Sequence, residues 1–103
     1  MKPLTIPPAA QADEQSIQML SAWIAKQGLH CAINVGMWDA QGRDEPAAWG
    51  MLLAEVVRQV AKAAREQGGA KPDQTIDAIV DSLLNELNDP GSPAPGSFDA
   101  QGA

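Results

Sequence analysis

The sequence predicts a small α+β domain, with about three helices packed on a minimal β-sheet in the order helix, strand, helix, helix. Three observations lead to this class. Residues 29–38 alternate between two sets of side chains, as a strand does. Residues 44–67 and 73–87 carry apolar side chains at helical spacing, and both chain ends are rich in proline or glycine.

The length of 103 residues suits one domain. We expect an extended N-terminal segment over residues 1–11, a single α+β domain over 12–88 and a flexible Pro/Gly/Ser tail over 89–103. A core of this size buries little area, and small domains of this kind often self-associate. Composition therefore predicts a homo-oligomer, either a dimer or a tetramer.

The first helix is expected over about residues 13–27. Asp13 and Glu14 suit the positive end of a helix dipole, and Gly28 is a natural stop. Ile17, Leu20 and Ile24 would form its apolar face.

The strand over 29–38 has no evident partner in the sequence, which predicts that it pairs with something else. One face would carry the apolar residues, which we predict to form the oligomer interface: Leu29, Cys31, Ile33, Val35 and Met37. An unpaired strand leaves backbone N–H and C=O groups without partners. We expect the strand to pair antiparallel with a second copy about a two-fold axis, with the run Leu4–Ile6, or with both.

The two remaining helices form an antiparallel hairpin. Asp44 is expected to cap the helix over 44–67, with Pro46 in its first turn and Gly68-Gly69 at its end. Gly50 would allow a close approach to the strand. Asp73 is expected to cap the helix that runs to about Leu87.

Composition excludes several function classes. A net charge of −6 is unfavourable for binding nucleic acid, and the apolar runs are too short to span a membrane. One cysteine and one histidine cannot build a disulfide or a structural zinc site. The N-terminus lacks a secretory apolar region, so we expect a cytoplasmic protein of a bacterium-like cell, with no metal, cofactor or catalytic set.

The second face of the strand offers a candidate ligand pocket, formed by His30, Asn34, Trp38 and Trp49. A structural histidine is the preferred interpretation of His30, with a ligand-binding or acid–base histidine as the alternative. Core and interface packing is the preferred interpretation of the tryptophans, with an aromatic pocket wall as the alternative. Because neighbours on a strand point to opposite faces, His30 and Cys31 cannot form a dyad within one subunit, and Cys31 is expected to be a buried, inert thiol.

Acidic residues recur every four positions along the last helix, from Asp73 through Asp77 and Asp81. This ridge suits a basic partner. The simpler interpretation is a set of ion pairs across the hairpin to the basic stripe, which consists of Arg58, Lys62 and Arg65.

Two stretches, GLHCAINVGMW and AWGMLLAEVVRQVAKA, together with the preceding LTIPPAA and a short acidic helix, resemble the bacterial family catalogued as domain of unknown function 5076. The resemblance covers about Leu4 to Leu87. His30, Gly36, Trp49 and Gly50 stand at characteristic positions, whereas Gln59 stands where a histidine would be expected, which weakens a two-histidine site. The resemblance implies a compact cytoplasmic α+β protein and supplies no activity.

Two functional hypotheses follow. The first is a non-enzymatic oligomeric module that binds another protein through its acidic last helix. The second is a small-molecule binder or simple enzyme with its pocket at His30, Asn34, Trp38 and Trp49.

Overall fold

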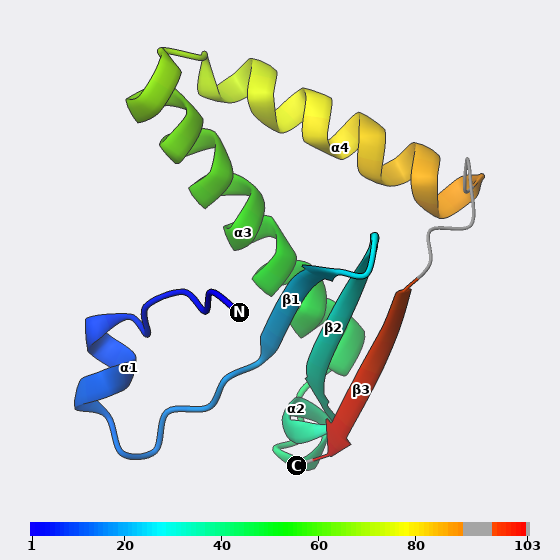
Figure 1. Cartoon of the computed structure of the whole chain (residues 1–103). Helices are drawn as coiled ribbons and strands as arrows, with labels where there is room; N and C mark the ends of the chain where they lie inside the picture. The colour runs from blue at the N-terminus through cyan, green and yellow to red at the C-terminus, as the bar shows by residue number, and fades with distance from the viewer. Residues whose placement is uncertain (90–95, 103) are drawn as a thin grey trace.

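The computed structural model describes residues 1–89 and, as backbone, 96–102 (Figure 1). Its elements follow in the order α1 (Pro8–Ala12), β1 (Leu20–Ala25), β2 (Gly28–Val35), α2 (Met37–Ala40), α3 (Glu45–Gly68), α4 (Pro72–Asn88) and β3 (Gly96–Gly102). The predicted α+β class is confirmed.

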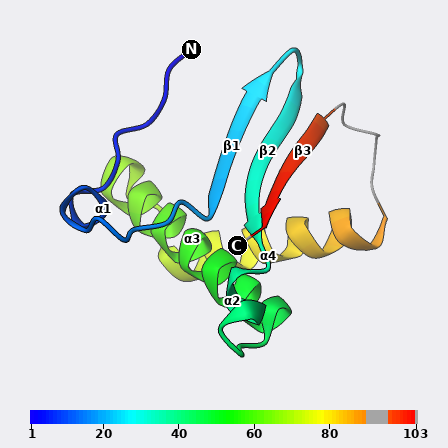
Figure 2. The ribbon, with the colours of Figure 1, turned by 90° about the horizontal axis from the view of Figure 1, so that it is seen from below.

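The sheet has three strands with β2 in the centre, side by side in one layer (Figure 2). β1 runs antiparallel to β2, with Leu20 opposite Ile33. β3 runs parallel to β2, with Leu29 opposite Gly96. Parallel neighbours require a long crossover connection, and the chain supplies it with α3 and α4.

The helix predicted over 13–27 is wrong, because this segment contains β1. A two-residue turn joins β1 to β2, and both of its residues, Lys26 and Gln27, have positive φ angles of 49° and 63°. Such turns match the twist of the flanking strands and usually carry Asn-Gly, so Lys-Gln gives no turn signal in the sequence. The spacing of Leu20 and Ile24 suits a helix face and a strand face equally well.

The β1–β2 hairpin also shows that the strand predicted over 29–38 has a partner within the chain. Both edges of β2 are occupied within the chain, so an antiparallel pairing of this strand with a second copy is wrong. The run Leu4–Ile6 is not a strand either. The predicted strand is too long at its end: Gly36 takes the left-handed φ of 100°, and Met37 and Trp38 belong to α2.

The C-terminal residues depart from the predicted flexible tail. Gly96–Gly102 pairs with the second edge of β2, while residues 90–95 and 103 lie outside the described part. Backbone groups alone make this ladder, so it needs no apolar pattern in the tail.

The hairpin of α3 and α4 agrees with the sequence in extent and differs from it in detail. Asp44 and Lys71 occupy the N-cap positions, and neither side chain caps its helix; Asp73 lies in the first turn of α4. Gly69, at a φ of 72°, ends α3 with its N–H donating to the Arg65 carbonyl at 2.9 Å. A side chain added at Gly50 would meet nothing within 4 Å, so the expected close approach is absent.

The arms of this hairpin diverge from their connecting loop (Figure 1). Near the loop, Ala61 is buried, and Ala64 and Ile76 are half-buried. From Val80 to Asn88, every α4 side chain is exposed. The helices therefore pack on each other only at the closed end of the hairpin.

Very few of the described side chains are buried. Among the side chains that the structure describes, Ala61 is the single fully buried apolar one. The accessible surface is 8512 Å², against about 5,500 Å² for a folded monomer of 10.8 kDa. The radius of gyration is 15.5 Å, against about 13 Å for a compact chain of this length. One copy alone is thus unusually open.

Candidate functional site

The predicted pocket residues lie in two separate places. Trp38 on α2 and Trp49 on α3 form one pair, with ring centroids 5.5 Å apart and ring planes at 87°. His30 and Asn34 lie on β2, on the face opposite Cys31, about 13 Å apart along the strand. The turn between the two tryptophans does bring them together, as the sequence suggested.

Glu45 explains why α2 and α3 hold the tryptophan pair. Its Oε1 accepts a hydrogen bond from the Asp39 N–H at 3.0 Å, and its Oε2 accepts one from the Trp49 Nε1–H at 2.8 Å. Partial burial raises the pKa of Glu45, but hydrogen bonds from the Asp39, Gly36 and Trp38 backbone and from the Trp49 indole outweigh it, so the pKa lies below its ordinary value. The carboxylate is ionised and fully used in holding two helices together, which is a structural role.

His30 makes a contact within its own hairpin. Its Nε2 lies 3.1 Å from the carbonyl oxygen of Ala25, which can only accept, so Nε2 carries the proton. Trp23 stands directly opposite it on β1, and the Trp23 indole N–H donates to the Ser21 hydroxyl. These contacts suit a structural histidine.

Asn34 lines a small polar hollow of about 60 Å³ at the end of the hairpin. Its backbone N–H donates to the Met19 carbonyl at 3.0 Å, while its Oδ1 is buried and accepts no hydrogen bond from the residues whose side chains are described. The hollow has room for about two water molecules and not for a metabolite. His30, Trp38 and Trp49 are not among its lining residues, which are Gln18, Leu20, Ser21, Ala32, Ile33 and Asn34.

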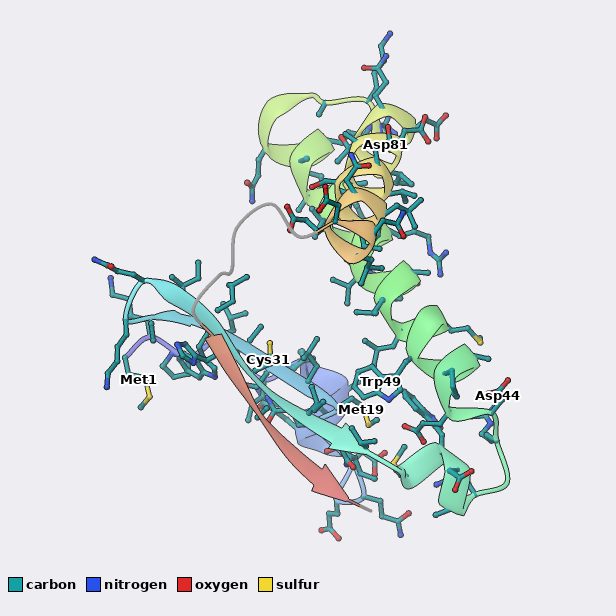
Figure 3. The ribbon with its side chains drawn as sticks, turned by 90° about the vertical axis from the view of Figure 1, so that its right-hand side faces the viewer. Met1, Met19, Cys31, Asp44, Trp49 and Asp81 are labelled. Atoms are coloured by element: carbon teal, nitrogen blue, oxygen red, sulfur yellow. The ribbon has the colours of Figure 1, made fainter. Side chains whose placement is uncertain are left out.

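The apolar face of the sheet looks toward the helices. Figure 3 shows Cys31 on the side of the sheet where α3 and α4 lie, and alternation places Leu29, Ile33 and Val35 on that same face. β1 extends it with Ile24, which is 84% exposed, next to Leu29 at 59%. Cys31 is half-buried and not fully enclosed. Four of the five predicted interface residues therefore form one open apolar face, while Met37 lies apart on α2.

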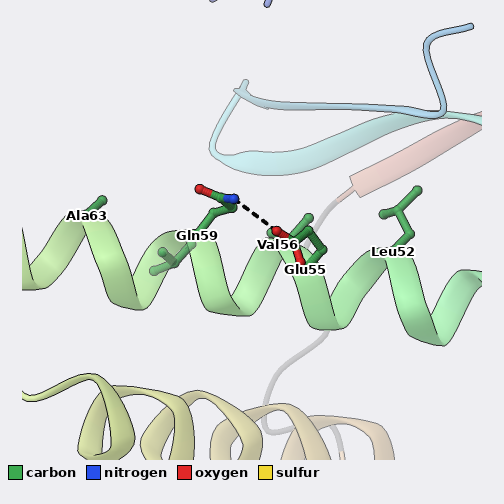
Figure 4. Close-up of a pocket in the computed structure, with 6 residues that line it drawn as sticks. Leu52, Glu55, Val56, Gln59 and Ala63 are labelled. Carbon is green, nitrogen blue, oxygen red and sulfur yellow. Dashed lines mark hydrogen bonds between the residues drawn. The ribbon is translucent and has the colours of Figure 1, made fainter.

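A second apolar surface follows α3. An open groove of about 540 Å³ runs along the helix on the side toward the β1–β2 hairpin (Figure 4), lined by Leu52, Glu55, Val56, Gln59, Val60 and Ala63. Val56 is 44% exposed and Val60 is 49% exposed. Leu52, Val56 and Val60 belong to the apolar stripe that the sequence predicts on this helix, where it is expected to build the core and the interfaces.

Glu55 holds the polar rim of this groove. Its carboxylate accepts a hydrogen bond from the Gln59 amide at 2.9 Å and pairs with Arg58 at 3.0 Å. The Gln59 and Arg58 hydrogen bonds lower the pKa of Glu55. This is the one ion pair in the described residues, so the ion pairs expected across the hairpin, between Arg58, Lys62 or Arg65 and the α4 ridge, are absent there.

Other site types find no support in the residues described. No three His, Cys, Asp or Glu side chains among them are placed to hold a metal ion. Within the same residues, no helix combines the length and apolar character needed to cross a bilayer.

Comparison with known proteins fits this picture. The sequence profile described as "Domain of unknown function (DUF5076)" matches residues 3–91. The chain belongs to this family. DUF5076 is an uncharacterised family, as the resemblance implied, and its match ends before β3.

A search of curated proteins found no match to this DUF5076 chain. The similar solved structures include one with a TM-score of 0.68 and 25% identity over 92% of each chain. It is described as "Structure of a putative pyruvate dehydrogenase from the photosynthetic bacterium Rhodopseudomonas palustrus CGA009". The likeness extends over nearly the whole length of both chains.

Proposed function

We propose that this DUF5076 protein is a non-enzymatic, homo-oligomeric interaction module of the bacterial cytoplasm, whose core is completed by a second copy of the chain. One observation carries the proposal: the described side chains bury a single apolar residue, Ala61, while large apolar side chains stay open on the sheet, on α3 and on α4. Burying apolar side chains is the main favourable term in folding. A chain that leaves them open needs a partner surface.

The size of the open surface favours a stable oligomer. The accessible area exceeds that of a compact monomer of the same mass by about 3,000 Å², part of it from the extended N-terminal residues. A standard interface buries about 800 Å² on each partner, and permanent homodimers bury more. The excess is therefore larger than the area that one partner contributes to a standard interface.

A small-molecule site at the His30 face is the alternative. The buried, unpartnered Oδ1 of Asn34 on that face favours it. Against it, the four predicted pocket residues are divided between two places, and the hollow at Asn34 is very small.

The exposed acidic ridge of α4, with Asp73, Asp77 and Asp81, would be a second surface of the module. In the described part these carboxylates have no ion-pair partner, so they are available to a basic protein. Reversal of charge at Asp77 and Asp81 should then weaken capture of such a partner without changing the oligomer.

Thermal unfolding at several protein concentrations tests the proposal. For an oligomer that folds as it assembles, the melting temperature rises with protein concentration, because assembly is linked to folding by mass action. A melting temperature independent of concentration over a hundredfold range contradicts the proposal. A metabolite that raises it in the native chain, but not in a folded His30→Ala variant, would establish the alternative.

A further inference from the structure

The last half of α4 carries apolar side chains that the described residues of its own chain leave exposed. Val80, Leu83, Leu84 and Leu87 recur at helical spacing on this half, with Leu84 49% exposed and Leu87 73% exposed. The same face of α4 packs on α3 nearer the loop, where Ile76 and Ile79 are half-buried. The apolar face of α4 therefore extends beyond the part of the helix that contacts α3.

The groove along α3 also leaves apolar side chains exposed. Leu52, Val56 and Val60 lie in the open groove along α3 that faces the sheet, whose own facing residues, such as Leu29, are also exposed. Two exposed apolar walls, one on α3 and one on the sheet, thus face each other (Figures 3 and 4). A helix fits between such walls when its apolar arc is broad enough to touch both.

We infer that the last half of α4 from a second copy occupies the α3 groove, and that the exchange is reciprocal. In a two-fold interface, the contact of α4 with the partner's α3 is made twice, so one arrangement covers both surfaces on both copies. Pairing α3 with the partner's α3 would instead leave Leu84 and Leu87 exposed. This inference rests on the proposed homo-oligomer and names the elements that form it.

The area agrees with this arrangement. The area exposed in excess of a compact monomer is about 3,000 Å² per chain, part of it on the extended N-terminal residues. Permanent homodimers bury about 2,000 Å² or more in total over both copies.

Cysteine cross-linking tests the inference directly. Cys31→Ala removes the single native thiol. Two such chains are co-expressed with different affinity tags, one carrying Val56→Cys and the other Leu84→Cys, and the purified complex is oxidised. We expect a disulfide between the two tagged chains, because the sulfurs must approach within bonding distance only in the mixed pair.

Arg58→Cys is the matched control for Val56→Cys. It lies two residues further along α3, about 200° around the helix, and its side chain is also exposed. We expect it to give little mixed disulfide with Leu84→Cys. Equal cross-linking at both positions would overturn the inference.

Two further outcomes separate the inference from the proposed function. An oligomer without a mixed disulfide refutes the packing of α4 in the groove and leaves the homo-oligomer standing. If the protein is a monomer, and a chain with both Val56→Cys and Leu84→Cys closes a disulfide within itself, then α4 closes on its own α3 and both proposals fail.

Discussion

Substitutions in the turn between β1 and β2 distinguish the observed hairpin from the helix predicted over residues 13–27. The two structures predict stability changes of opposite sign. Lys26 and Gln27 adopt φ angles of 49° and 63°, a conformation that costs an ordinary residue about 1–2 kcal/mol. Asn and Gly tolerate it better and are the usual pair in this turn. Lys26→Asn with Gln27→Gly should therefore stabilise the fold.

The expected gain is about 1 kcal/mol. Removing the strain at two positions recovers more than this, but glycine also makes the unfolded chain more flexible, which returns about 0.5–1 kcal/mol. For a domain of this size, about 1 kcal/mol raises the melting temperature by roughly 4–8 °C. If residues 13–27 were a helix instead, Asn and Gly inside it would destabilise the protein by about 1.5 kcal/mol.

Urea unfolding followed by tryptophan fluorescence, at one fixed protein concentration, measures the difference. The control is Lys26→Ala with Gln27→Ala, which leaves the positive φ angles strained and should change stability little. A helix would instead gain or keep stability from alanine and lose it from Asn-Gly. Loss of stability in the Asn-Gly variant would refute the hairpin.

Two other predictions concern glycine and pH. Gly50→Ala should stabilise α3 by about 0.5–1 kcal/mol, since a Cβ there meets open space. Gly69→Ala should destabilise the protein by about 1 kcal/mol, because Gly69 has a φ of 72°. Chemical unfolding of both variants measures this difference. Glu45 has a pKa below its ordinary value of 4.5 in the folded chain, so its stabilisation is present above that value and is lost as pH falls through the folded pKa. Glu45→Gln should therefore flatten the fall in stability on acidification; an unchanged acid limb would contradict the role given to this carboxylate.

The two long helices could be predicted from sequence because their signals are local. Pro46 near the start and Gly69 at the end bound α3, and its apolar stripe repeats over six turns. The pairing of Trp38 with Trp49 also follows from local geometry, since a short turn joins their helices.

The first strand and the last could not be predicted for different reasons. β1 is short, and Leu20 and Ile24 match both a helix and a strand period, so only the Lys26-Gln27 turn decides, and those residues give no turn signal. β3 forms by pairing with the second edge of β2, and the two strands lie far apart in the sequence. The Pro-rich composition before it predicts a tail.

The residues of the candidate site lie in two places for a related reason. Assigning Trp38 to the strand put it on the face of His30, whereas Gly36 ends the strand and turns Trp38 toward α3. The apolar set on β2 was identified from alternation alone, and four of its five members do share a face. Alternation along the strand identifies this face, but it carries no information about contacts between chains.

The solution mass of the native chain tests the central claim most directly. Light scattering coupled to size exclusion should give at least twice the 10.8 kDa of one chain, since the apolar faces of the sheet, α3 and α4 need a partner. Leu84→Glu, which places a charge on the exposed half of α4, should lower that mass toward one chain. A native mass of 10.8 kDa across the concentration range would contradict the account.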